Sequence, residues 1–115
     1  MIIKIKKNYT PIIINLLLFL SSTVVEARSL ETGEKLFLKN CNVCHVGGNN
    51  IIIPEKNLRF ETLKANGMDN LDAIIYQVTN GKNGMPAFGG RLNETQIEKI
   101  ANYILYELQE RVINY

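Results

Sequence analysis

Apolar residues recur at three- and four-residue steps near the C-terminus, the spacing that gathers them on one face of a helix. The residues on this face are Ile97, Ile100, Ala101, Ile104 and Leu108. Asn93 lies before them and Gln96 follows it by three positions. In such a capping box each side chain bonds a backbone N–H that the first helical turn leaves free. The pattern therefore predicts a C-terminal helix that begins after Asn93.

Shorter helical patterns precede this one. LETGEKLFLKN, residues 30–40, gathers Phe37 and other apolar residues near one face, and Ser29 is a suitable N-cap for it. RFETLKAN follows and is closed by Gly67 in a left-handed C-cap, and NLDAIIYQVTN comes next and is closed by Gly81. Asp69 or Asn70 is expected to cap the second of these helices.

The segments between the helical patterns are predicted loops. Residues 47–58 contain GGNN and Pro54, and GKNGMPAFGGR, which begins at Gly81, holds four glycines and a proline. Within the mature domain the only run of three β-branched residues, Ile51–Ile53, is too short to build a sheet. The chain of 115 residues is therefore expected to fold as one small all-α domain.

The N-terminus has the three parts of a secretory signal: lysines, a short apolar run and small residues before a cleavage point. We predict a cleaved signal peptide over residues 1–27 and a mature domain over 28–115. A membrane anchor is the alternative, but the run Pro11–Val25 is shorter than the about 20 residues that span a bilayer. No stable membrane insertion is expected.

Charge excludes one class of partner. The formal net charge of the whole chain is +2, from 13 basic and 11 acidic residues. Residues 1–27 hold three of the basic residues and one of the acidic ones, so the mature domain would carry ten of each. A nucleic-acid-binding domain would show a basic stripe, and none is present.

CNVCH contains both cysteines, Cys41 and Cys44, and the only histidine, His45. Structural zinc requires four ligands, and this motif offers three. A redox pair of the thioredoxin kind requires a βαβ frame, which the pattern lacks. A disulfide would close a very small loop and would leave His45 without a role. Covalent haem attachment uses all three residues: each thiol bonds one vinyl group, and the histidine then lies beneath the iron.

A haem iron needs a second axial ligand or keeps an open position. Cytochromes c pair histidine with a methionine thioether, and Met68 and Met85 are the candidates. Pro86 favours an extended backbone at Met85, and the neighbouring glycines allow close approach to a flat ring. Met85 is therefore the predicted ligand, whereas Met68 is expected to fill core or loop space.

Other residues are expected around such a haem. His45 needs an acceptor for its second ring N–H, and the carbonyl of Pro54 in the following loop is the predicted one. Two interpretations of Gln77 are open, because its amide can face either the haem or water. Phe88, within the methionine loop, is expected to line the haem pocket.

CNVCH and NGKNGMPAFGGRL together resemble the class I cytochromes c, and more closely the cytochrome c6 family. The resemblance covers essentially the whole mature domain and implies a small all-α fold with short helices and loops around one haem c. It implies that the first and last helices cross, with Gly33 and Phe37 meeting Ile100 and Tyr103. Met85 would be the sixth iron ligand.

The resemblance also implies a function. The family transfers single electrons from cytochrome f of the cytochrome b6f complex to photosystem I in the thylakoid lumen. Gln77 would tune the haem potential and Arg91 would contact photosystem I. A soluble, monomeric electron carrier, and not an enzyme, is therefore expected. The alternatives are a periplasmic cytochrome c that feeds a terminal oxidase, a haem sensor or peroxidase with an open iron position, and a disulfide-stapled structural domain.

Overall fold

The computed structural model describes residues 31–114, and within this range the chain is helical. Its α-helices are α2 (Gly33–Asn40), α3 (Asn42–His45), α4 (Phe60–Ala65), α5 (Leu71–Asn80), α6 (Glu94–Asn102) and α7 (Leu108–Ile113). Two 3₁₀ turns, η1 (Val46–Gly48) and η2 (Pro54–Lys56), and one π-helical turn, η3 (Tyr103–Glu107), complete the elements. The described residues contain no strand, only an isolated bridge between Lys82 and Met85. The all-α prediction is confirmed.

The helix ends follow the predicted caps with one exception. Asn93 and Gln96 form the expected capping box of α6, and the Asn70 side chain accepts a hydrogen bond from the Ala73 N–H of α5. Helix α2 starts at Gly33 and is capped by Thr32. The predicted cap Ser29 lies outside the described residues, as does the predicted signal peptide.

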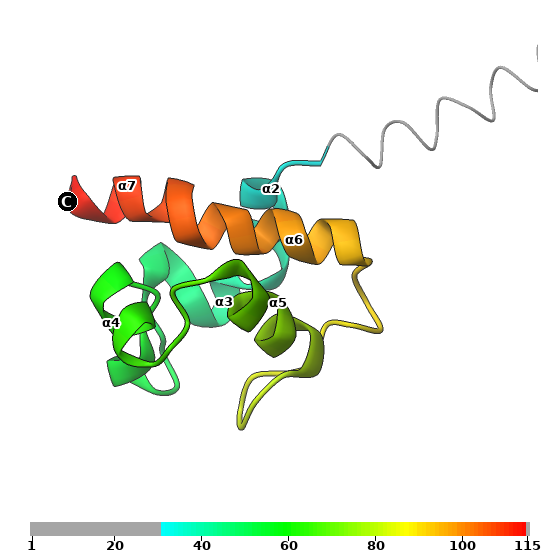
Figure 1. Ribbon diagram of the computed structural model, residues 1–115, viewed down its shortest axis with the longest axis horizontal. Helices are drawn as coiled ribbons and strands as arrows, with labels where there is room; N and C mark the ends of the chain where they lie inside the picture. The colour runs from blue at the N-terminus through cyan, green and yellow to red at the C-terminus, as the bar shows by residue number, and fades with distance from the viewer. Residues whose placement is uncertain (1–30, 115) are drawn as a thin grey trace, which may run out of the picture. The chain divides into compact units, whose positions relative to one another are not determined.

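The core is built around the crossing of α2 and α6 (Figure 1). A Cβ placed on Gly33 would lie 2.2 Å from the carbonyl oxygen of Lys99, so only glycine allows this approach. Phe37 and Tyr103 pack with ring centroids 5.2 Å apart at the same crossing. The predicted contact between the first and last helices is therefore confirmed, and it explains why a glycine occupies a helical position.

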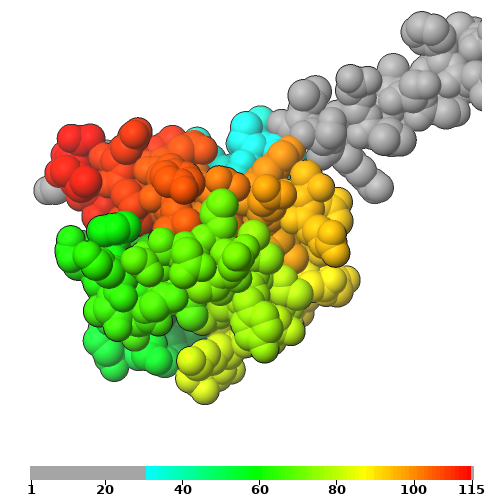
Figure 2. Space-filling view, in the orientation of Figure 1, coloured from blue at the N-terminus to red at the C-terminus, as the bar shows by residue number. Residues whose placement is uncertain are grey.

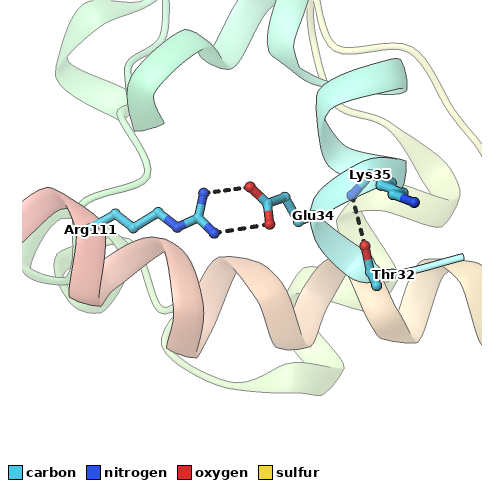
Figure 3. A network of polar contacts seen from close by, with 4 residues as sticks. All are labelled: Thr32, Glu34, Lys35 and Arg111. Carbon is cyan, nitrogen blue, oxygen red and sulfur yellow. Dashed lines mark hydrogen bonds and ion pairs between the residues drawn. The ribbon is translucent and has the colours of Figure 1, made fainter.

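One ion pair joins the two ends of the described chain (Figure 3). The guanidinium of Arg111 in α7 donates two parallel hydrogen bonds to the carboxylate of Glu34 in α2. These bonds lower the pKa of Glu34. Arg111 also lies over the Tyr103 ring, 5.9 Å from its centroid. The pair links α7 to α2 beside the crossing, but it is exposed and therefore adds little to stability.

The last helix departs from the predicted pattern in the middle of its length. It is one continuous rod over α6, η3 and α7, in which the Leu108 N–H bonds the Tyr103 carbonyl, a five-residue step. This π turn buries Leu105 and Gln109, which the simple helical pattern did not place on the apolar face. Helix α5 packs against the α6 part of this last helix, and the two segments touch in the space-filling view (Figure 2).

Replacement of Gly33 by alanine tests the crossing. Alanine in a helix is normally favourable over glycine by up to about 1 kcal/mol. Here the added methyl group would overlap the Lys99 carbonyl, so we expect Gly33→Ala to lower the unfolding free energy by about 1–3 kcal/mol.

Guanidinium unfolding provides the measurement, with Gly90→Ala as the matched control. A Cβ on Gly90 would meet nothing within 4 Å, so this variant should unfold like the wild type. Equal stability of the two variants would contradict the account of the crossing.

Candidate haem site

A cleft opens between α3, the loop after it, α5 and the loop that carries Met85. The empty space between its walls, together with open solvent at its mouth, is about 1330 Å³. Apolar side chains dominate the lining, including Ile52, Leu63 and Phe88. The predicted site residues on the lining are Cys41, Cys44, His45, Gln77, Met85 and Phe88. Residues up to 47 positions apart in sequence, from Cys41 to Phe88, are thus brought to one cavity.

The two cysteines are presented by a single helical turn. The N–H groups of Cys44 and His45 both bond the Cys41 carbonyl, at 3.1 and 2.9 Å, which fixes the spacing of the motif. Both thiols are free, and Cys41 is buried. Burial, together with the nearby Cys44, raises the pKa of Cys41 to about 11. The Cys41 thiol is therefore neutral at physiological pH.

His45 is held in one tautomer by the turn that follows it. Its Nδ1 lies 2.9 Å from the carbonyl oxygen of Asn49. Because a carbonyl only accepts hydrogen bonds, Nδ1 carries the proton and Nε2 keeps a free lone pair. A lone pair on Nε2 is what a metal ligand requires.

The prediction that the Pro54 carbonyl accepts the hydrogen bond from His45 is wrong. The Pro54 carbonyl instead accepts a hydrogen bond from the Asn57 amide at 3.3 Å, and Pro54 is exposed and absent from the cleft lining. The cause is the backbone after His45. Gly47 and Gly48 have φ of 63° and 79°, so the chain reverses at once and presents the Asn49 carbonyl to the ring first.

Met85 and Gln77 meet inside the cleft. The Gln77 amide Nε2 lies 3.9 Å from the Met85 sulfur, so the Gln77 side chain faces the cleft. The backbone of Met85 is fixed by paired hydrogen bonds with Lys82, both of 3.0 Å. Met68 also lines the cleft, where it is half-buried and packs against the core.

Phe88 and Arg91 occupy the end of the methionine loop. Phe88 is buried, and its N–H bonds the Val78 carbonyl at 2.9 Å, which ties the loop to α5. Arg91 is exposed and does not line the cleft. Its guanidinium carbon lies 5.7 Å from the centroid of the Phe88 ring. The charged group of Arg91 therefore lies over the Phe88 ring, and Phe88 itself lines the cleft.

Sequence reasoning missed the residue that shapes the wall beside His45. Asn50 accepts hydrogen bonds from the N–H groups of Ile52 and Ile53, at 3.0 and 2.9 Å, and donates one to the Lys56 carbonyl at 3.1 Å. The signal was present in GGNN, because asparagine side chains commonly bond the backbone two residues on.

These residues fit a c-type haem. Two thiols stand at the ends of one helical turn, an imidazole beside them has a free Nε2, and a thioether from a separate loop lines the same apolar cleft. Within residues 31–114, no three His, Cys, Asp or Glu side chains gather as a metal cluster of their own. None of the helices described is both long and apolar enough to span a bilayer.

Comparison with known proteins agrees with this fit. A family model described as cytochrome c oxidase, cbb3-type, subunit III, matches residues 28–104. Cytochrome c6 of Bumilleriopsis filiformis is 57% identical over 81 residues, which cover 70% of this chain and 94% of that protein. Cytochrome c6 of Porphyra purpurea is 55% identical over 87 residues, 76% of this chain and 79% of that one.

A solved structure extends the comparison to the fold. Cytochrome c6 from the diatom Phaeodactylum tricornutum superposes with a TM-score of 0.65 at 47% identity, over 69% of this chain and 93% of that chain.

Fold and cleft thus define a haem-binding cytochrome of class I. Within that class, the chain belongs to the cytochrome c6 family, a family of electron-carrier cytochromes.

Gly81 begins the loop that presents Met85, and its replacement tests that loop. Its φ is +70°, and an added Cβ would lie 2.6 Å from the Met85 carbonyl oxygen. We expect Gly81→Ala to lower the unfolding free energy by about 1–3 kcal/mol, because strain and overlap add together.

Gly84→Ala, three residues along the same loop, is the control. A Cβ there would make only ordinary contact with Ile52, at 3.5 Å. Thermal unfolding of both variants measures the difference, and a loss no greater for Gly81→Ala than for Gly84→Ala would refute the role of Gly81.

Proposed function

We propose that the protein carries single electrons by means of one haem c, bound covalently through Cys41 and Cys44 and ligated by His45 and Met85. One observation supports this most strongly: all four side chains line the same cleft, with the amide of Gln77 at the Met85 sulfur. The chain's entire set of cysteine and histidine residues is used in this arrangement.

Each residue has a separate task in this proposal. The two thiols would hold the porphyrin through thioether bonds, each S–H having added across one vinyl double bond, so that the cofactor could not dissociate. The hydrogen bond from His45 to the Asn49 carbonyl orients the imidazole and increases its donor strength. The Gln77 amide, close to the Met85 sulfur, helps to set the potential.

A bound haem would supply the one-electron redox chemistry of such a carrier. The chain's contribution is to keep both ligands and the apolar walls fixed in either state. Two protein ligands leave no open position for a substrate. We therefore propose a carrier and not an enzyme.

The donor, acceptor and compartment are proposed from the family. Cytochrome f of the cytochrome b6f complex would reduce the protein and photosystem I would oxidise it, in the thylakoid lumen, after export by the predicted signal peptide. Arg91, exposed beside Phe88, is the proposed contact for photosystem I. The soluble carrier would act as a monomer, with transient contacts to both partners.

A second candidate has one observation in its favour. The matching family model is described by the subunit of a cbb3-type oxidase. A periplasmic cytochrome c that donates electrons to a terminal oxidase would use the same haem site. The cleft serves either role, so the acceptor has to be identified by kinetics.

Met85→Leu tests the proposed ligand set. Loss of the thioether should lower the midpoint potential by on the order of 100 mV, within the roughly 0.8 V over which axial ligands set haem potentials. It should also let cyanide bind the oxidised protein. Redox titration and cyanide binding measure both effects.

Met68→Leu is the matched control, because Met68 lines the same cleft. Its potential should equal that of the wild type. If Met68→Leu and not Met85→Leu showed the loss, the ligand assignment would be wrong.

Flash-induced re-reduction of photosystem I tests the proposed acceptor. The purified, reduced protein should accelerate re-reduction. Arg91→Gln should slow it most at low ionic strength, because the range of an exposed charge grows from about 10 Å at 0.1 M salt to about 30 Å at 0.01 M. Arg59→Gln, which removes another exposed arginine, should behave like the wild type. Acceleration of a terminal oxidase without any effect on photosystem I would favour the second candidate.

A further inference from the structure

Gln109 is the buried polar side chain in the core of residues 31–114. Its amide Nε2 donates two hydrogen bonds, one to the Ile104 carbonyl at 2.7 Å and one to the Leu58 carbonyl at 2.8 Å. The first bond stays within the last helix, whereas the second reaches a loop 51 residues away in sequence. A single NH₂ group has two protons, so both are used and the donor is fully satisfied.

The π turn explains why Gln109 faces inward. In an uninterrupted α-helix, Gln109 would point about 140° away from Ile104, since successive residues are rotated by about 100°. The five-residue step over Tyr103–Glu107 adds about one residue to the turn and reduces this angle. The amide thereby reaches both the Ile104 carbonyl and the loop.

Leu58 connects Gln109 to the turn behind His45. The carbonyl of Leu58 accepts from Gln109, and the N–H of Leu58, in the preceding peptide group, donates to the Gly48 carbonyl at 2.7 Å. The next carbonyl along the chain, that of Asn49, accepts the hydrogen bond from His45 Nδ1 at 2.9 Å. Three hydrogen bonds, joined by the backbone of Leu58 and of Gly48–Asn49, thus connect Gln109 to the imidazole.

Apolar packing supports the same connection. A Cβ on Gly48 would lie 3.3 Å from Val112 Cγ2 and 3.7 Å from Leu108 Cδ2, so η1 is pressed against α7 on either side of Gln109. Two of the residues beside this junction, Asn57 and Leu58, line the haem cleft. The contact between η1 and α7 therefore adjoins the wall of the cleft that holds His45.

We propose that Gln109 is a positioning residue for His45: it fixes the Leu58 peptide, and through it the Gly48–Asn49 turn that orients the imidazole. This inference rests on the proposed role of His45 as an iron ligand. The π turn then has a structural role, because it turns the Gln109 amide toward the loop that contains Leu58.

Hydrogen exchange in the reduced, haem-loaded protein tests the proposal. Gln109→Met keeps the size of the side chain but removes the donor. We expect the Leu58 N–H and the His45 Nδ1–H to exchange at least about tenfold faster than in the wild type, because the hydrogen bond that holds the Leu58 carbonyl is lost. Backbone amides in α2 and α5 should keep their wild-type rates.

Asn102→Leu is the matched control on the same rod. The Asn102 amide bonds only the Glu98 carbonyl of its own helix, at 2.9 Å, so its loss should leave the His45 proton unaffected. Uniformly faster exchange in α2, α5 and at His45 in Gln109→Met would reduce Gln109 to a general stabilising residue. Faster exchange at Leu58 with an unchanged His45 proton would also overturn the proposal.

Gln109→Glu provides a second test if the methionine variant folds poorly. A protonated carboxyl group can donate to the Leu58 carbonyl, whereas a carboxylate cannot. Protection of the His45 proton should therefore be higher in acid and fall as the pH rises, a dependence that the wild type should lack. Equal protection of the His45 Nδ1–H in acid and at neutral pH in Gln109→Glu would contradict the inference. A different result would contradict the proposed function: His45 would not be bound to haem iron even in the wild-type protein.

Discussion

The close contact between the backbones of α2 and α6 at Gly33 is the constraint on which the rest of the structure depends. Without a side chain at this point, the helix that leads into CNVCH lies against the helix that ends the domain. Phe37 and Tyr103 then pack beside it, and Glu34 pairs with Arg111. The crossing thereby fixes the origin of the segment that carries Cys41, Cys44 and His45.

The cleft is assembled from loops, and a few specific residues fix their shape. Gly47 and Gly48 turn the chain after His45, Gly81 turns it before Met85, and the Asn50 side chain organises the wall between them. Few regular hydrogen bonds are available in such loops, so each of these local bonds matters to the position of a neighbouring ligand. The fold thus keeps an imidazole and a thioether on one apolar cavity with little regular structure.

Short sequence patterns such as helix caps predicted most of the helices, whereas hydrogen bonds and burial that depend on the path of the backbone could not be predicted from them. The capping box at Asn93 and the glycine after α5 act within one helical turn, so their pattern is visible in the chain. The acceptor of His45 was wrongly assigned to Pro54 because the answer depends on two left-handed glycines between them. The burial of Gln109 depends on a π turn, which no simple helical period reveals.

The central claim is that His45 and Met85, which line one cleft, would both ligate the iron of a haem bound there. The visible absorption spectrum of the oxidised wild-type protein tests this most directly. The account predicts the long-wavelength band that a methionine sulfur bound to ferric haem produces. Absence of this band from the folded, oxidised, haem-loaded protein would contradict it.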